Sequence, residues 1–410
     1  MSLPAEVHTV VVGGGLAGLA AARRLDRAGV DWLLIEGADR LGGRVTTDIV
    51  DGWRLDRGFQ VLNTGYPRVP ALVDVDALDM RYFTSGVLVR RGGALHRLEH
   101  PVRGPWHAPH TLVAGVGTLT DRLRFAALAT RCATYPPSRL LGAPEITAHE
   151  ALRRAGLSPR IIEEVLRPFL SGVFADPELE TSSHVLAMVL RSFVRGRIGV
   201  PAAGMAALPA ALAGPLPYAR LIVGTPVVSV SPGLVRTAEG DVRCRSVVVA
   251  TDPVTCAALL PTLGTPATRE LTTWYFAATT PPIDEAVLLL DGDRRRIIAN
   301  TVVLSNAAAE YAPAGRSLIA ASIVGPGPDE PAVRAELARL YGTSTADWET
   351  LSTVRLPHAL PAAGVPQGRL RKPVSLGDGL FVAGDHRDSP SIQGALASGW
   401  RTARAVLENA

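Results

Sequence analysis

The sequence has few cysteines and no long apolar run. Its three cysteines, Cys132, Cys244 and Cys256, lie far apart and form no C-x-x-C pair. This pattern excludes a dense disulfide framework and argues against a cysteine-based metal site. No apolar stretch reaches the length of a membrane-spanning helix. We therefore expect inert thiols, no bound metal and no transmembrane segment.

Lysine is almost absent, because Lys372 is the only lysine among the 42 basic residues. The arginines are scattered and form only short clusters such as residues 294–296, unlike the concentrated basic patch of a nucleic-acid-binding protein. Arg23 and Arg24 interrupt the first apolar stretch, which is not the pattern of a signal peptide. We therefore expect a cytoplasmic protein that binds no nucleic acid, and we leave contact with a membrane surface open.

The length of 410 residues favours two domains over one small core. Near the N-terminus, the residue pattern predicts a buried strand over 9–12, a helix over 16–27 and a strand over 32–35, which together make a βαβ unit. Near the C-terminus, a strand that ends at Gly384-Asp385 precedes a predicted helix over 392–407. These two units are typical of one nucleotide-binding domain built from both ends of the chain.

The middle of the chain contains a second set of elements. We predict a fold of the α/β class, in which a Rossmann-like domain (residues 1–60, 196–264 and 351–410) carries an α+β substrate domain (residues 61–195 and 265–350). The proline-rich stretch 101–109 is predicted to be a loop or boundary. We expect helices over 119–133, 148–156, 159–170, 183–194 and 332–341, and antiparallel strands over 274–278, 286–290, 296–303 and 318–323.

Three glycines stand where the first strand turns into the first helix. Gly13, Gly15 and Gly18 fit the G-x-G-x-x-G spacing, in which glycine permits a tight turn, close approach to a pyrophosphate and close packing of helix on sheet. The first residues of the helix, Leu16 and Ala17, then present backbone N–H groups to the phosphates. Glu36, at the end of the second strand, is placed to accept hydrogen bonds from ribose hydroxyls and argues against NADP. These residues leave NAD and FAD open.

The stretch "EGADRLGGR" (36–44) resembles the E-x-x-x-R-x-G-G-R signature of the flavin-containing amine oxidase superfamily, which includes monoamine oxidases, protoporphyrinogen oxidases and phytoene desaturases. The resemblance implies that this segment runs along the pyrophosphate and ribityl chain of FAD. An arginine at its end would supply charge-assisted hydrogen bonds to phosphate. The cofactor-binding residues so implied are Glu36, Gly37, Arg40, Gly42, Gly43 and Arg44.

Further segments extend the resemblance over most of the chain. "LDRGFQVLNTGYP" (55–67) is similar to the segment that the desaturase branch places against the flavin ring, and "VPAAGMAALPAAL" (200–212) to its P-x-G-G-M-x-x-L element, with Ala203 in place of one glycine. "GLFVAGDHRDSPSIQGALASGW" (379–400) resembles the C-terminal flavin motif, whose helix points at the pyrimidine edge of the flavin. From these segments and the strand at 227–230, we expect cofactor contacts from Gly58, Phe59, Gln60, Val228, Gly384, Asp385, Ser391, Ile392, Gln393 and Ala395.

The resemblance implies an FAD-dependent oxidoreductase with non-covalently bound FAD. Hydride transfer to flavin needs no acid–base triad, and we assign no catalytic side chain. We expect a dehydrogenase or desaturase that acts on an apolar, isoprenoid-like small molecule, with an amine oxidase or protoporphyrinogen-oxidase-like enzyme as the alternative. A non-catalytic binding protein, like the Rab GDP-dissociation inhibitors of the same fold, is disfavoured because both ends of the cofactor site are intact. Tyr66, Tyr275 and His386 are candidate substrate contacts.

Overall fold

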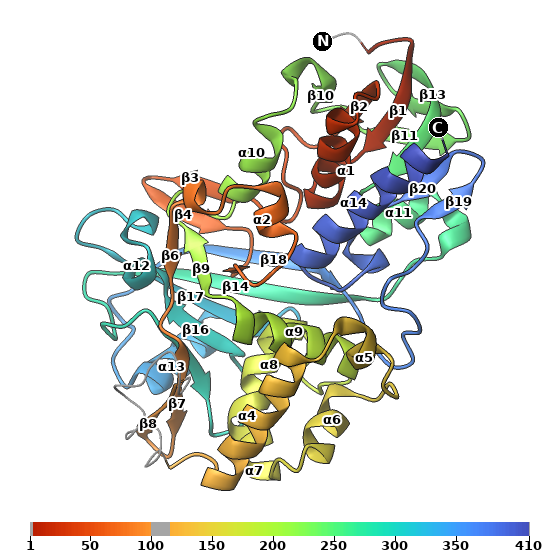
Figure 1. The fold of residues 1–410 in the computed structure, drawn as a ribbon. Helices are drawn as coiled ribbons and strands as arrows, with labels where there is room; N and C mark the ends of the chain where they lie inside the picture. Colours follow the sequence, from red (N-terminus) through yellow and green to blue (C-terminus); the bar gives the residue numbers. More distant parts are fainter. Residues whose placement is uncertain (1–2, 100–114, 410) are drawn as a thin grey trace.

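The valine-rich run near the N-terminus forms a central strand of an eight-stranded sheet in the computed structural model of this chain, which describes residues 3–99 and 115–409 (Figure 1). β1 (Glu6–Val12) pairs in parallel with β2 (Trp32–Ile35) on one side and with β13 (Gly240–Val249) on the other. Such strands are apolar throughout because both faces of a parallel sheet are covered. The sheet is completed by β10 (Leu221–Ile222), β11 (Val227–Ser231), β12 (Leu234–Thr237), β19 (Ser375–Gly377) and β20 (Leu380–Val382).

Two helices from opposite ends of the chain, α1 (Leu16–Arg27) and α14 (Ile392–Glu408), lie side by side against this sheet (Figure 1). They approach closely because glycine stands at their contact. A Cβ atom on Gly399 would lie 2.0 Å from the carbonyl oxygen of Ala17. The predicted Rossmann-like domain is confirmed by this packing and by the parallel pairing of β1.

The second sheet has seven strands and is antiparallel apart from one parallel pair, β15 with β7. The predicted antiparallel set is confirmed, but one domain boundary is not. Residues 349–361 form an edge strand paired with β14, so residues 351–361 belong to this sheet and not to the nucleotide-binding domain. In spatial order the strands are β18 (Glu349–Pro361), β14 (Thr268–Ala278), β17 (Ser317–Val324), β16 (Asn300–Val303), β15 (Leu288–Asp291), β7 (Gly86–Arg91) and β8 (Ala94–Glu99).

Alternating residues of the second sheet face different neighbours, as the two-residue period of a strand requires. Tyr275 on β14 packs into a core shared with α1, whereas the next residue, Phe276, packs against α13 (Glu330–Tyr341). Leu290 and Val89 face a layer of helices that covers the lower part of the molecule in Figure 1. That layer contains α4 (Leu119–Thr134), α5 (Pro137–Leu141), α6 (Ala148–Arg154), α7 (Pro159–Ile161), α8 (Arg167–Phe174) and α9 (Ser183–Arg195).

One predicted helix and one predicted strand differ from expectation for local reasons. The helix expected over 159–170 widens into a π-helical turn, Ile162–Leu166, before α8. Pro168 has no N–H to donate to the carbonyl of residue 164, so regular α-helical bonding cannot continue there. The strand expected over 296–303 begins only at Asn300, since the Asp291 carboxylate accepts the backbone N–H groups of Arg295 and Arg296 in a tight turn.

Small elements connect the two sheets. The hairpin of β3 (Thr47–Val50) and β4 (Trp53–Asp56) and the three-stranded sheet of β5 (Leu62–Asn63), β9 (Ile198–Pro201) and β6 (Met80–Tyr82) lie between them. Among the described residues, no helix has the length and apolarity to cross a membrane. The proline-rich stretch 101–109 lies outside the described residues. The remaining helices are α2 (Val69–Leu72), α10 (Ala207–Ala213), α11 (Pro253–Leu259) and α12 (Leu304–Ala307), and the 3-10 turns are 76–78, 218–220, 261–263, 309–311 and 385–387.

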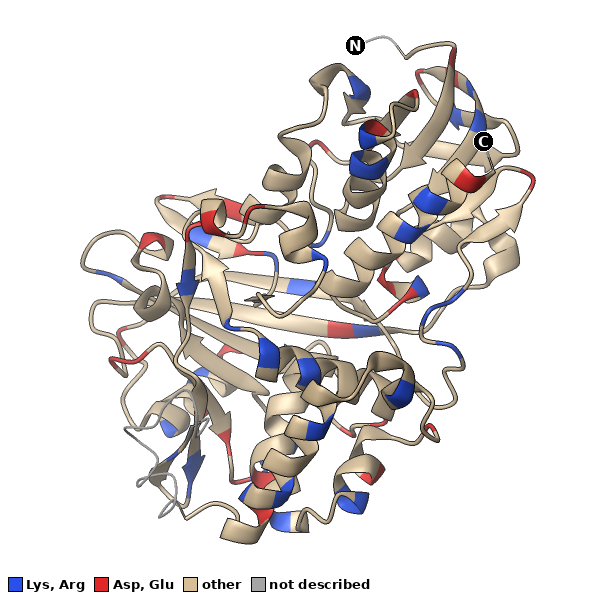
Figure 2. Ribbon diagram, viewed as in Figure 1, with Lys and Arg blue, Asp and Glu red and all other residues tan. Residues whose placement is uncertain are grey.

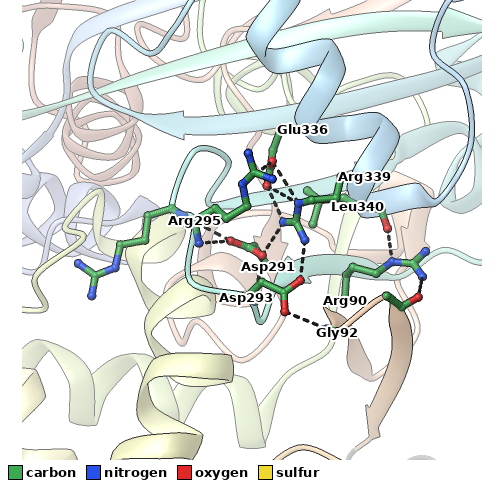
Figure 3. Close-up of polar contacts among 10 residues, drawn as sticks. Arg90, Gly92, Asp291, Asp293, Arg295, Glu336, Arg339 and Leu340 are labelled. Carbon is green, nitrogen blue, oxygen red and sulfur yellow. Dashed lines mark hydrogen bonds and ion pairs between the residues drawn. The ribbon is translucent and has the colours of Figure 1, made fainter.

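A cluster of paired charges fastens α13 to the end of β15, and we call it the α13 cluster (Figure 3). Arg339 donates to Asp291 (2.6 Å), Asp293 (2.8 Å) and Glu336 (2.6 Å). Arg295 lies 3.4 Å from Glu336. Although burial opposes the shift, hydrogen bonds with Glu336 and Asp291 raise the pKa of Arg339. Arg339 and Arg295 thus each meet a carboxylate, whereas Arg90 beside them donates to the carbonyl oxygens of Leu340 and Gly93.

Candidate cofactor and active site

The glycine loop leaves open space in front of the first helix. At Gly13, φ is +106° and a Cβ atom would lie 2.9 Å from the backbone of Ala250, so the tight turn needs glycine. At Gly15, which caps α1, a Cβ atom would meet nothing within 4 Å. The first N–H groups of the helix, from Leu16, Ala17 and Gly18, point toward this space without intrahelical acceptors. The geometry fits a pyrophosphate at the helix N-terminus.

The second glycine pair lies directly against the first loop. Gly42 donates its N–H to the carbonyl oxygen of Gly14 (2.9 Å), and a Cβ atom on Gly43 would lie 3.3 Å from the Cα of Gly15. Glu36 extends across the loop and accepts N–H groups from Gly14 (2.5 Å) and Ala38 (2.8 Å). The structure thus places the predicted acid and both glycine segments at one spot, which spacing alone does not establish.

Two other residues of this segment have protein partners. Arg40 forms an ion pair with Asp48 on β3. Gly37 packs against Pro226, since a Cβ atom there would lie 3.4 Å from its Cα. Contacts of Arg40 and Gly37 with the cofactor remain predictions.

Arg44 links the two halves of the candidate site. Its guanidinium donates to Asp385 (2.7 Å), at the end of the last strand, and to the carbonyl oxygen of Ala359 on β18 (2.8 Å). Burial disfavours its charge, but Asp385 raises the pKa of Arg44 overall. Arg44 and Asp385 are predicted to contact the pyrophosphate and the ribityl chain. The structure adds that each orients the other.

Asp56 forms a buried network that the sequence did not indicate. Its side chain is 2% exposed and accepts hydrogen bonds from the Thr47 hydroxyl (2.6 Å), the Met205 N–H (3.0 Å) and the Tyr311 hydroxyl (2.9 Å). Burial raises the pKa of Asp56 to about 6, against the opposing effect of these donors. The network holds the start of the 55–67 segment against β3, the loop before α10 and the 3-10 turn 309–311.

Tyr275 has a different role from the predicted one. Its side chain is 0% exposed, and its hydroxyl donates to the carbonyl oxygen of Asp56 (2.8 Å). A side chain enclosed in the core has no surface left for a substrate. Tyr275 therefore positions the flavin segment and does not contact substrate.

The segment after Asp56 crosses the edge of the second sheet. Gly58 has φ of +85°, and Phe59 donates its N–H to the Thr273 hydroxyl on β14 (3.2 Å). The Gln60 amide nitrogen donates to the carbonyl oxygen of Arg44 (2.6 Å). The Gln60 Oε1 atom is buried and has no hydrogen-bond partner within residues 3–99 and 115–409. A polar ligand would satisfy it.

His386 folds back over the end of the last strand. At Gly384, φ is +149°, and a Cβ atom would lie 2.4 Å from the imidazole of His386, so the ring occupies the space of a side chain. Both ring nitrogens are buried without a hydrogen-bond partner in the described part of the chain. Burial lowers the pKa of His386 to about 4, although Asp385 opposes this shift, so the imidazole is neutral at pH 7. The orphaned atoms of His386 and Gln60 fit a bound cofactor.

The C-terminal helix begins at a side-chain cap. Ser391 accepts the N–H of Gly394 (3.1 Å), so it caps α14, and Ile392 and Ala395 pack against the core that includes α1. Gln393 accepts the backbone N–H of Arg68 (2.9 Å). Contacts of these residues with flavin remain predictions.

Two candidate residues lie toward the surface. Val228 is 68% exposed on β11, next to a bulge between residues 227 and 229. Tyr66 is half-buried beside the same core, and burial raises its pKa to about 12. An adenine contact at Val228 and a substrate contact at Tyr66 remain predictions.

Cysteine and metal chemistry have little support at this site. Burial raises the pKa of Cys244 and Cys256 to about 11, so both thiols are unreactive at neutral pH. Within the described ranges, no group of three His, Cys, Asp or Glu residues is arranged for a metal ion.

Comparison with known proteins identifies relatives of the chain. The sequence profile described as flavin containing amine oxidoreductase matches residues 16–407. A coproporphyrinogen III oxidase from Mycobacterium bovis is 29% identical over 218 residues, which is 50% of this chain and 46% of that protein. A putrescine oxidase from Kocuria rosea is 33% identical over 150 residues, 36% of this chain and 29% of that protein. The chain thus spans less than half the length of the curated relatives that it matches here.

The fold itself is shared with solved structures. An oxidoreductase from Methanosarcina mazei superposes with a TM-score of 0.74 over 98% of this chain and 100% of its own, at 19% identity. At that level of identity the similarity concerns the fold alone.

Proposed function

Because the chain belongs to the flavin-containing amine oxidoreductase family, we propose that it binds FAD non-covalently and oxidises a small apolar, isoprenoid-like molecule. When bound, FAD supplies the acceptor for a hydride from a substrate C–H bond. The open space at Gly15 and the orphaned atoms of Gln60 and His386 support a cofactor along this path. The high pKa and burial of the cysteines support a flavin held without a thioether.

One observation carries the proposal of an apolar substrate. Two buried carboxylates of the flavin motifs already have partners: Asp385 pairs with Arg44, and Asp56 lies in its buried network. Neither is available to bind the ammonium group of an amine. Several partly exposed apolar side chains pack against the core that holds the 55–67 segment. They include Phe59, Tyr66, Phe83, Val354 and Ile392.

The protein's own residues have distinct roles in this proposal. The Arg44–Asp385 pair fixes the strand end beside the ribityl chain, and the Asp56 network fixes the segment at the ring. A neutral His386 can donate one hydrogen bond and accept another, so it can orient a polar group of cofactor or substrate. The second sheet, through Thr273 and Ala359, holds these loops in place.

The first test is the identity of the cofactor. Acid precipitation of the purified protein should release a yellow compound into the supernatant. The mass of this compound should be that of FAD. A colourless protein that FAD does not reconstitute would contradict the proposal and favour a non-catalytic binding protein.

The second test is anaerobic bleaching of the bound flavin by a panel of polyene hydrocarbons, primary and secondary amines, and porphyrinogens. We expect bleaching by the apolar hydrocarbons. Rapid bleaching by an amine, with a rate constant of flavin reduction above about 1 per second, would replace the proposal by an amine oxidase.

A porphyrinogen oxidase is the second candidate, and one observation favours it. The match to a coproporphyrinogen III oxidase extends over half of this chain, further than the putrescine oxidase match. Bleaching by a porphyrinogen alone in the same panel would select this candidate.

A further inference from the structure

The outer face of α14 carries a pocket that shares only Gln393 with the predicted cofactor contacts. A cavity of about 390 Å³ lies between this helix, the residues before α2, and the segment before β19. Four of the residues that line it are Arg68, Arg371, Arg401 and Arg404. We call this cavity the α14 pocket. In Figure 2, basic bands on α14 lie beside those on α1, in the upper part of the molecule.

The pocket has more positive than negative charge. Asp388 lies 3.4 Å from Arg401 and 3.8 Å from Arg371, and Glu408 lies 3.4 Å from Arg404. Arg68 has no ion-pair partner in the part of the chain that the structure describes. Burial, and then repulsion from Arg371 and Arg404, lower the pKa of Arg68. Two carboxylates therefore serve four guanidinium groups, and no acid lines the cavity itself.

Two of the four arginines, Arg68 and Arg401, are held in place before any ligand arrives. The guanidinium of Arg68 lies 5.5 Å from the centre of the Trp400 indole, which also carries Arg24 at 4.7 Å. Arg401 donates to the carbonyl oxygens of Lys372 (3.2 Å) and Arg387 (2.9 Å). Positioned guanidinium groups lose little conformational freedom when they bind an oxyanion.

We propose that the α14 pocket binds a small molecule that carries two or more phosphoryl or carboxylate groups. Guanidinium groups match the planar, bidentate geometry of these oxyanions, and the volume is that of a small-molecule site. The ligand would join segments 300 residues apart in sequence, Arg68 with Arg371 and α14. It would add to the existing link between Arg68 and Gln393. The site is separate from the substrate proposal and does not depend on it.

The test uses flavin-saturated protein, so that the cofactor's own phosphate site is filled. Isothermal titration with pyrophosphate and, separately, with citrate, at fixed ionic strength in chloride, should give one saturable site for at least one of them. Pyrophosphate binding alone identifies a phosphoryl ligand, and citrate binding alone a carboxylate ligand. Arg68→Gln and Arg404→Gln should each weaken binding about tenfold, the effect of losing one charge-assisted contact, and the double variant should abolish it.

Two control variants separate the α14 pocket from nonspecific charge attraction and from the flavin site. Arg236→Gln removes an exposed arginine paired with Asp241 on a distant hairpin and should leave binding unchanged. Gly15→Val should lose flavin but retain anion binding, which separates this site from the proposed function. Absence of saturable binding by both anions, full binding in the double variant, or equal weakening by Arg236→Gln would each overturn the proposal. If either single variant fails to fold, Arg371→Gln replaces it, because the Arg371 side chain is 64% exposed.

Discussion

Two arginine-rich regions of this molecule hold their charge in opposite ways. In the α13 cluster, Arg339 contacts three carboxylates at distances of 2.6–2.8 Å (Figure 3). In the α14 pocket, four arginines share two carboxylates around a cavity of about 390 Å³. An arginine that is paired with carboxylates in a packed region stabilises the fold. Where arginines outnumber the nearby carboxylates around a cavity, they are available to bind a ligand.

Substitutions in the glycine loop should have the largest effects, because Gly18 is closely surrounded whereas Gly15 faces open space. Gly18→Val should prevent folding, because a Cβ atom would lie 1.9 Å from the carbonyl oxygen of Gly13. Gly15→Val should fold, because its Cβ atom points into open space, but should lose its flavin. Circular dichroism reports the fold, and absorbance at the flavin band reports the cofactor. A Gly15→Val protein with a full complement of flavin would falsify the placement of the cofactor.

The paired cluster should show the next largest effect. Asp291→Ala removes one of the three carboxylates that Arg339 contacts and leaves the backbone N–H groups of Asp293, Arg295 and Arg296 without their acceptor. Losing hydrogen bonds to a buried carboxylate costs about 1.5–3 kcal/mol, and we expect a loss of about 3 kcal/mol in the free energy of unfolding by urea. Asp241→Ala, in an exposed pair with Arg236 at 3.5 Å, is the control and should change little. If Asp291→Ala and Asp241→Ala were equally stable, the α13 cluster would not stabilise the fold, and its contrast with the α14 pocket would be lost.

Asp56 is an intermediate case, a buried carboxylate that meets only neutral donors. Its pKa of about 6 lies above the ordinary value of 3.8, so folding favours the protonated form. The stabilising contribution is complete below about pH 4 and is lost as the pH rises through 6. Relative to Asp56→Asn, wild-type protein should therefore lose up to about 3 kcal/mol between pH 4 and pH 7. Urea unfolding of both proteins across this range measures the difference, and a constant difference would refute the assignment.

The α14 pocket should show the smallest effect on stability. Arg404→Gln removes a charge that other arginines repel, and its own pair with Glu408 is exposed. We expect the free energy of unfolding without added anion to stay within about 0.5 kcal/mol of wild type. A loss as large as that of Asp291→Ala would mean that the pocket is structural.

The elements that were predicted well are determined by residues close together in the sequence. The bounds of α1 and β2 follow from the glycine loop and the valine run. The parts that were missed depend on contacts distant in sequence. Asp56 meets Tyr311 and Tyr275 across more than 200 residues. The strand at 349–361 can be assigned to the second sheet only from its pairing with β14. The four arginines of the α14 pocket are far apart in sequence, so the sequence does not indicate that they line one cavity.

The ion pair between Arg44 and Asp385 has a consequence for the order of events during synthesis. The two residues are 341 positions apart, and β1 also waits for β13 and then β20 to complete its sheet. A ribosome that has translated the first 240 residues has therefore produced the glycine loop without its sheet partner, and one edge of β1 is unprotected. The proposed flavin site is complete only after the last strand and helix have emerged from the ribosome. Until then the growing chain exposes an unpaired strand edge. Such an edge is prone to aggregation, and chaperones protect chains in this state.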